Sequence, residues 1–215
     1  AFETYADDVR YALGENLVRM RRPVGLQITT LRGSGQNPGD KRASPGFVDF
    51  VGWRAPANTP PMAHFAKLEA LAAGAEPGTA AAARARLNMA RAYLAYDLAP
   101  EALGALKLAL QEDPKLENST AFRVMRGAAN VMLGRMKDAE TEFFATAALS
   151  DPSAALWRGM VLLNKEDYAG ARDAFLSGNS AMALYAPAWR AKFQAAAARA
   201  SLGMGDVPAA QTYVK

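Results

Sequence analysis

The side chains that could carry covalent or acid–base chemistry are few in this sequence. It contains no cysteine and one histidine, His64. The lack of cysteine excludes thiolate nucleophiles, cysteine-ligated zinc and disulfides. A single histidine leaves no zinc cluster and no conventional histidine triad. The place of His64 beside Phe65, within a helical pattern, indicates a packing or surface residue.

Two acidic pairs and one glycine-rich stretch are the remaining candidates for a reactive site. Glu112 and Asp113, like Glu140 and Glu142, lie too close in sequence to face each other across a substrate. Residues 33–41 are rich in glycine, but they lack the spacing of a phosphate-binding loop, and no helical pattern follows them directly. The sequence therefore predicts no catalytic residue, no metal site and no cofactor, in a protein that is not an enzyme.

The composition is that of a folded protein with a substantial core. Of 215 residues, 51% are apolar and 21% are charged, which excludes a disordered charged tail. The net charge of +4 is too small to indicate a nucleic-acid partner, and no apolar run is long enough to span a membrane. The absence of cysteine fits a periplasmic or otherwise exported protein, with a cytoplasmic location as the alternative.

Alanine is the residue type in excess, and it indicates an all-α fold. The chain has 48 alanines, 42 of them after residue 61, and alanine has the highest helix propensity. Turn residues divide this part of the sequence into short helical segments, which suggests stacked antiparallel pairs. Helices are predicted near residues 62–74, 80–97, 100–112, 119–133, 136–149, 153–165, 168–177, 187–203 and 207–215.

The first 61 residues differ from the rest, and we predict that they form a separate region. Apolar residues between Phe2 and Leu17 recur at three- and four-residue steps, which predicts an amphipathic helix over residues 2–22. Residues 23–61, called the strap, contain six prolines and six glycines and are expected to be extended. Residues 62–215 would then form the helical repeat domain.

The strap has two stretches that could pair as a short β-hairpin, residues 24–31 and 47–53. The second stretch carries three large aromatic side chains, Phe47, Phe50 and Trp53. Such side chains are not expected to stay in water, so they either pack on the helices or dock on another chain. We therefore predict that these three residues are the contacts of the strap.

The helical region carries a repeated register of small and large residues. Four alanines recur 37, 32 and 39 residues apart, and we call this the alanine position: Ala102, Ala139, Ala171 and Ala210. Twelve residues earlier lies the small position: Ala90, Gly127, Gly159 and Ala198. Five residues earlier lies the turn position: Asp97, Gly134, Glu166 and Gly205. Four residues later lies the large position: Leu106, Phe143, Phe175 and Val214.

This register has a direct physical interpretation. Small side chains let two helices approach closely where they cross. The large residue one turn later is expected to fill the gap to the next pair. Stacked pairs then share a core that no single pair could bury alone.

The residues of the first unit are similar to a known repeat. Residues 89–93, 101–109 and Pro114 combine a small and an aromatic residue, an alanine pair and a terminal proline. In these features the chain resembles the tetratricopeptide repeat family over residues 80–215, with a Sel1-like or other helical repeat as the nearest alternative. The resemblance implies a protein-binding scaffold in which the first helix of each pair lines a concave groove.

Projection of this register onto the sequence gives the residues of the implied groove. They are Asn88, Arg91, Leu94, Val124, Met125, Ala128, Met132, Leu156, Trp157 and Met160. Such a groove is apolar and rich in methionine, which favours a helix or an extended segment docked by shape. Trp157 has two interpretations of equal weight, an anchor for a partner or a core residue between repeats.

The expected function is therefore protein binding. The leading interpretation is a non-catalytic interaction scaffold, or an assembly subunit of a larger, multi-subunit complex of the bacterial envelope. The alternatives are an accessory or regulatory repeat domain of a larger enzyme, and a chaperone for a secreted client. Tyr213 and Val214 lie on a short last helix without a partner. We expect that the polypeptide continues past Lys215 or that another subunit covers this edge.

Overall fold

The structure is a computed structural model that describes residues 10–13, 18–21, 45–144 and 148–214. Its contacts divide the chain into two compact units, Ala1–Arg42 and Ala43–Lys215. We call the second of these the helical unit. The sequence predicts a division after residue 61, whereas the contacts assign residues 45–60 to the helical unit.

The described part of the first unit is a pair of short strands. β1 (Arg10–Leu13) pairs with β2 (Val18–Arg21) in antiparallel register, with Arg10 opposite Arg21. The prediction of a helix over residues 2–22 is therefore wrong for these eight residues. Val18–Arg21 alternates apolar and charged side chains, a period of two that favours a strand over a helix. The predicted strand at residues 24–31 lies outside the described residues.

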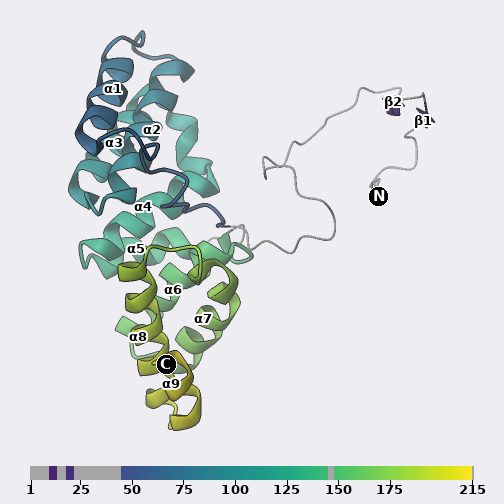
Figure 1. Ribbon diagram of the computed structural model, residues 1–215, viewed down its shortest axis with the longest axis vertical. Coiled ribbons are helices and arrows are strands. Elements are labelled where there is room, and N and C mark those ends of the chain that lie inside the picture. Colours follow the sequence, from purple (N-terminus) through teal and green to yellow (C-terminus); the bar gives the residue numbers. More distant parts are fainter. Residues whose placement is uncertain (1–9, 14–17, 22–44, 145–147, 215) are drawn as a thin grey trace. The chain divides into compact units, whose positions relative to one another are not determined.

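The helical unit confirms the predicted all-α architecture of stacked helices with contacts between antiparallel neighbours. Four pairs follow one another along the stack, α2/α3, α4/α5, α6/α7 and α8/α9, and α1 packs on α2 (Figure 1). The elements are α1 (Pro61–Ala73), α2 (Ala80–Ala95), α3 (Ala99–Glu112), the 3₁₀ helix η1 (Pro114–Asn118), α4 (Thr120–Met132), α5 (Met136–Phe143), α6 (Pro152–Asn164), α7 (Tyr168–Met182), α8 (Pro187–Gly203) and α9 (Val207–Tyr213). None of the described helices is both long enough and apolar enough to cross a bilayer.

Most helix boundaries agree with the predictions because they are set by local capping. Ser119, Asp151 and Asp167 each accept a hydrogen bond from a backbone N–H of the first turn of the helix that follows. Two ends differ from the prediction. α5 ends at Phe143 instead of residue 149, and α7 continues past Gly178 to Met182. Gly178 lies inside α7, where a β-carbon would lie 2.7 Å from the side chain of Leu156, so it marks a close contact between helices and not a helix end.

The four turn positions share one backbone geometry. Asp97, Gly134, Glu166 and Gly205 all have positive φ, at 62°, 72°, 61° and 74°. In each turn the N–H of the next residue bonds a carbonyl five residues back, at 2.9 to 3.0 Å, which is the Schellman ending of a helix. The turn position of the register therefore has the same structure in all four pairs.

Glu166 occupies this left-handed conformation at a cost, and glycine should relieve it. We expect Glu166→Gly to stabilise the helical unit by up to about 1 kcal/mol, since a side chain in this region of φ is disfavoured. Gly134→Ala, at the matching turn, should destabilise it by about 1 kcal/mol. Urea unfolding followed by circular dichroism at 222 nm measures both. A loss of stability in Glu166→Gly would contradict this account of the turn.

The alanine and small positions are the places where paired helices cross. Ala102, Ala139 and Ala171 are fully buried. A β-carbon on Gly127 would lie 2.6 Å from the ring of Phe143, and one on Gly159 would lie 2.8 Å from the ring of Phe175. The large residue thus covers the small residue of its own pair. The missing β-carbon makes room for the ring within the pair, a contact that the register did not predict.

Candidate partner-binding site

Most residues of the predicted groove are core residues. The structure buries six of the ten almost completely: Leu94, Val124, Met125, Ala128, Leu156 and Trp157. Side chains without exposed surface cannot line an open groove, so the prediction of an open groove is wrong for these six; Trp157 is covered in part by the ring of Phe50, 5.9 Å away. Their apolar side chains serve the contacts within and between pairs. Trp157 is accordingly a core residue in this structure.

The other four groove residues reach the surface. Asn88 is exposed, and Arg91, Met132 and Met160 are half-buried. The guanidinium of Arg91 donates a hydrogen bond of 3.1 Å to Oδ1 of Asn88, and burial lowers the pKa of Arg91. These four side chains remain available to a partner.

Part of the strap lies on the helices where the sequence predicted an open groove. Residues 46–55, called the anchor segment, form turns and not the predicted strand. Within it, the N–H of Trp53 bonds the carbonyl of Asp49 at 3.0 Å, and the N–H of Gly52 bonds Oδ1 of Asp49 at 2.8 Å. Of the three predicted contacts, Phe50 is buried, and Phe47 and Trp53 are half-buried against the core. The aromatic side chains of the strap therefore pack on the helices.

The start of α6 holds the backbone of the anchor segment. The N–H of Phe47 donates to Oδ2 of Asp151 at 3.0 Å, and the N–H of Val48 donates to the hydroxyl of Ser153 at 3.1 Å. That hydroxyl in turn donates to Oδ1 of Asp151 at 2.5 Å. Both side chains are buried, and a β-carbon on Gly46 would lie 2.5 Å from the Asp151 carboxylate. A buried acid and hydroxyl thus bind two successive backbone N–H groups beside a residue that must be small.

The side chain of Phe50 belongs to an aromatic cluster. It consists of Phe50, Trp53, Trp157, Tyr185, Trp189 and Phe193. The ring of Phe50 lies 5.3 to 6.2 Å from the rings of Tyr185, Trp157 and Trp189, centroid to centroid. Nε1 of Trp157 donates to the Tyr185 hydroxyl at 3.0 Å, and burial raises the pKa of Tyr185. The polar atoms of this pair are therefore bonded to each other inside an otherwise apolar pocket.

The anchor segment ends on α2. Nε of Arg54 donates to the carbonyl of Ala95 at 3.2 Å, and its guanidinium lies 5.3 Å from the ring centroid of Tyr96. The N–H of Ala55 donates to the Tyr96 hydroxyl at 3.2 Å. Next to this contact, Oδ1 of Asp97 accepts a hydrogen bond from Nε1 of Trp189. The anchor segment therefore links the end of α2 with α6 and α8, elements far apart in sequence.

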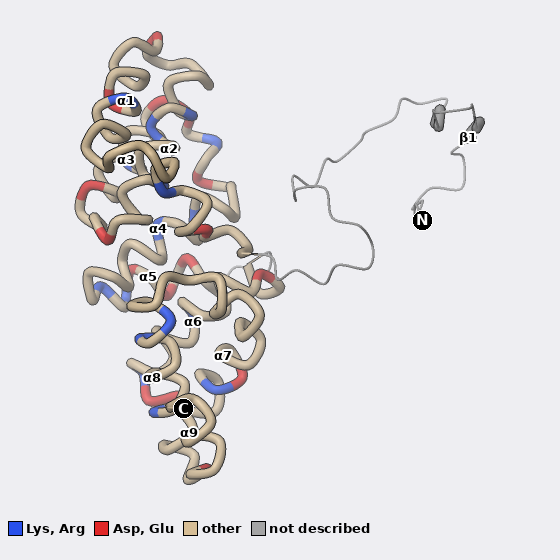
Figure 2. The backbone as a smooth tube through the Cα atoms, viewed as in Figure 1, with Lys and Arg blue, Asp and Glu red and all other residues tan. Residues whose placement is uncertain are grey.

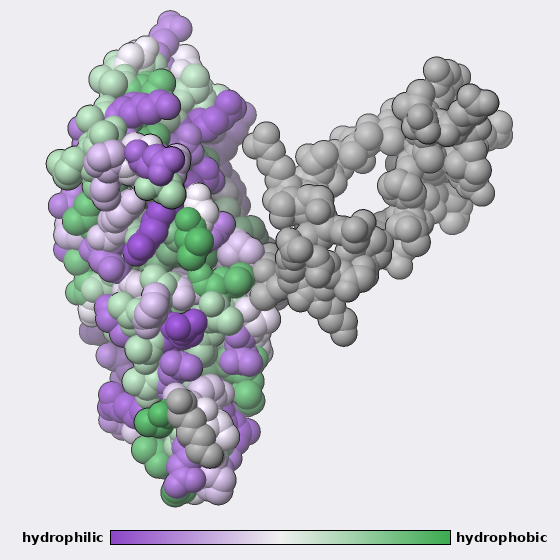
Figure 3. Space-filling model, in the orientation of Figure 1, coloured by the Kyte–Doolittle hydropathy of each residue, from purple (hydrophilic) through white to green (hydrophobic). Residues whose placement is uncertain are grey.

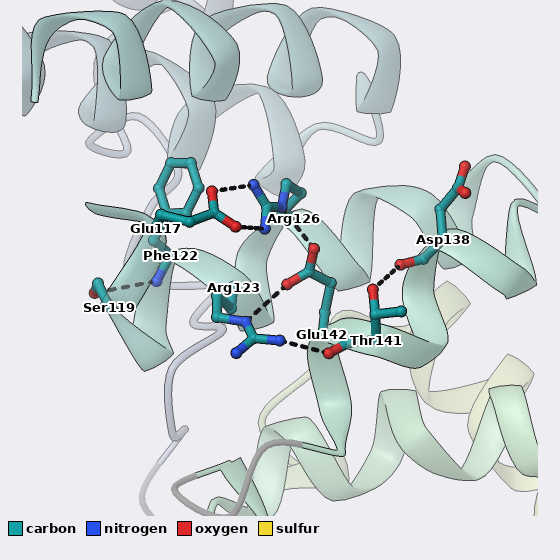
Figure 4. A network of polar contacts seen from close by, with 8 residues as sticks. All are labelled: Glu117, Ser119, Phe122, Arg123, Arg126, Asp138, Thr141 and Glu142. Atoms are coloured by element: carbon teal, nitrogen blue, oxygen red, sulfur yellow. Dashed lines mark hydrogen bonds and ion pairs between the residues drawn. The ribbon is translucent and has the colours of Figure 1, made fainter. Parts of the chain in front are cut away.

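The strongest charged contacts join η1, α4 and α5 (Figure 4). Arg126 makes two hydrogen bonds to Glu117, at 2.7 and 2.8 Å, and a third to Glu142 at 2.7 Å. Nε of Arg123 bonds the other oxygen of Glu142 at 3.1 Å. The bond from Arg126 lowers the pKa of Glu117. Because both oxygens of the buried Glu142 are engaged, this network fixes the second pair and offers no free carboxylate.

The acidic residues singled out from the sequence do not converge. Glu142 faces the arginines of α4, while Glu140 bonds Nζ of Lys165 at 2.5 Å. Among the residues that the structure describes, no three His, Asp or Glu side chains are placed to hold a metal ion. Basic and acidic residues are interspersed along the helices (Figure 2). The helical unit therefore presents charges of both signs.

An exposed apolar surface lies on α8, on α9 and on the residue that follows α9. Leu202, Val207 and Val214 are 55%, 50% and 77% exposed. With Ala198, Ala210 and Gln211 they line a hollow of about 400 Å³, and we call these six residues the end face. Apolar surface is visible beside α9 (Figure 3). Gln211 is the one polar side chain in this lining, so the end face suits an apolar partner.

Two residues of the end face are exposed at register positions that are buried in the three preceding pairs. Eight residues before the alanine position stand Leu94, Val131, Leu163 and Leu202; the first three are at most 6% exposed. At the large position, Leu106, Phe143 and Phe175 are buried, whereas Val214 is exposed. The sequence predicts that Val214 lacks a partner but singles out neither Leu202 nor Val207, although Leu202 can be compared with its three equivalents in the sequence.

Comparison of this chain with protein-family models, with curated proteins and with solved structures gave no match.

Proposed function

We propose that this chain is a non-catalytic protein-interaction scaffold of the tetratricopeptide-like type, and an assembly subunit of a larger complex. Its end face binds the apolar face of a helix of a partner polypeptide. The observation that carries the proposal is the exposure of Leu202 and Val214 at register positions that are buried in the three preceding pairs. The periplasm remains the predicted compartment, on the cysteine count alone.

The choice of a helix as the occupant follows from the contacts inside the stack. α4, α6 and α8 each pack against the second helix of the preceding pair. In each of the three preceding pairs, the element next to the surface equivalent to the end face is therefore a helix. A hollow with one polar side chain in its lining favours apolar side chains over charged ones, because burial of an unpaired charge is costly. An amphipathic helix offers the apolar stripe that this surface requires.

A negative charge at the centre of the end face should abolish the association. We expect Leu202→Asp to weaken partner binding by about 2 kcal/mol or more, roughly 30-fold, because the carboxylate would be buried without a counter-charge. The measurement is quantitative mass spectrometry of the chains that co-purify stoichiometrically with the tagged protein from its native source.

Leu71→Asp is the matched control. Leu71 is 57% exposed, as Leu202 is at 55%, but it lies on α1, at the other end of the helical series. The control should retain the partner and the helical circular dichroism signal. Equal retention by both variants, or the absence of any stoichiometric partner from the unsubstituted protein, would refute the proposal. A longer polypeptide with a catalytic region would instead indicate an accessory domain of an enzyme.

A further inference from the structure

The anchor segment is bound to the helices as a separate peptide would be. We propose that the surface of α2, α6 and α8 beneath it is a peptide-recognition site for a segment of another chain, with the anchor segment as its built-in occupant. The ligand class is an extended or turn-forming peptide with a small residue, an aromatic residue four positions later and an arginine four positions after that. This site consists of other residues than the end face.

The contacts to the backbone do not depend on covalent connection to the rest of the chain. Asp151 and Ser153 bind the N–H groups of Phe47 and Val48, more than 100 residues away in sequence. Any peptide without proline at these two positions can present two successive N–H groups to these buried acceptors. The approach of the Asp151 carboxylate to Gly46, whose φ is 75°, restricts the preceding position to glycine. The start of α6 therefore fixes the position of a bound peptide and its first residue.

Side-chain recognition comes from the pocket and from the end of α2. Phe50 is 3% exposed among the rings of Trp157, Tyr185 and Trp189, whereas the next residue, Val51, is 59% exposed. An aromatic residue is therefore required at the position of Phe50. The position of Val51 accepts any residue type. Arg54 adds a hydrogen bond to the carbonyl of Ala95 and a cation–π contact with Tyr96. Val48 is 1% exposed and Trp53 is half-buried against the core, so apolar residues are selected at these two positions as well. These are the contacts of a linear motif, in which Val51 is a permissive position.

The built-in occupant determines how such binding is observed. A tethered segment competes at an effective concentration of the order of millimolar. A peptide added in trans will therefore bind the unsubstituted protein weakly, and it will bind well once the internal phenylalanine is removed. A natural partner must either exceed the internal segment in affinity or bind when that segment has detached.

The test uses the full chain with Phe50→Ala and a fluorescein-labelled synthetic peptide of residues 45–56, followed by fluorescence anisotropy. We expect the peptide to bind the variant at least tenfold more tightly than the unsubstituted protein. The same peptide with alanine in place of its phenylalanine should bind the variant at least tenfold more weakly. Equal binding of the two peptides, or no binding to the folded variant, would overturn the proposal.

Two further arms keep the result decisive. If Phe50→Ala is unfolded by circular dichroism, the peptide should restore its helical signal, because a ligand of the folded state shifts the folding equilibrium. Failure to restore the signal would count against the site. Adding Leu202→Asp to the variant should leave peptide affinity unchanged, so that failure here is separable from failure of the end-face proposal.

Discussion

Gly127→Ala is expected to destabilise the helical unit by about 2 kcal/mol, although alanine is the better helix former. The added β-carbon would lie 2.6 Å from Cζ of Phe143 and 3.0 Å from Cβ of Glu142. The ring cannot yield easily, because Phe143 is fully buried and Glu142 is held by Arg123 and Arg126. Either α4 and α5 separate or the ring leaves its rotamer, and both disturb the packing of the second pair.

Gly104→Ala is the matched control for this substitution. Gly104 also lies within a helix, α3, but a β-carbon there would meet nothing within 4 Å. This change should stabilise the protein by about 0.5 to 1 kcal/mol through helix propensity alone. Urea unfolding gives both values. If the two substitutions shift stability in the same direction, the close crossing at Gly127 does not have the energetic role assigned to it.

A second substitution separates the two parts of this interpretation. Phe143→Leu should cost stability on its own because it leaves a cavity. Combined with Gly127→Ala, it should restore part of the stability that Gly127→Ala removes, because the smaller side chain makes room for the new methyl group. Strict additivity of the two losses would contradict direct contact between these positions.

Trp157→Ala is expected to have the largest effect of any single substitution considered, about 3 to 5 kcal/mol. Trp157 is fully buried at the centre of the aromatic cluster, within 6.2 Å of the rings of Phe50, Tyr185, Trp189 and Phe193. Its removal leaves a large cavity. It also takes away the indole N–H that bonds the buried Tyr185 hydroxyl, and an unpaired buried hydroxyl adds to the cost.

Trp53→Ala removes the same residue type from the edge of the same cluster. Trp53 is half-buried and touches Phe50 with a centroid distance of 6.2 Å. Its loss should cost about 1 to 2 kcal/mol, in proportion to the smaller apolar area involved. Urea unfolding and near-ultraviolet circular dichroism measure both variants. Similar losses for the two would show that Trp157 is not the centre of the cluster.

The helices and their turns could be predicted from the sequence because their determinants are local. Caps such as Ser119 and Asp151 act on the N–H groups of the next turn of chain. The turn position could be found because the same left-handed backbone recurs at one place in the register. The strands Arg10–Leu13 and Val18–Arg21 could not be predicted with the same ease, because their apolar residues fit a helical spacing as well as an alternating one.

The location of the anchor segment could not be predicted, because it depends on contacts between residues far apart in sequence. Nothing near Phe47 in the sequence indicates that its N–H bonds Asp151. The groove was misplaced for a related reason. The register places Leu94 and Leu156 on first helices, but only the packed structure shows that neighbouring elements cover them. Leu202 could have been found, since three buried equivalents precede it.

The most direct test of the central proposal, that a partner helix covers the end face, is site-specific photo-cross-linking in the native cell. A photoreactive amino acid replaces Leu202 in one variant and Leu71 in the other, two positions of nearly equal exposure. We expect one discrete cross-linked product from position 202, joined to a helical segment of the partner, and none from position 71. The same product from both positions, or none from position 202, would contradict the proposal.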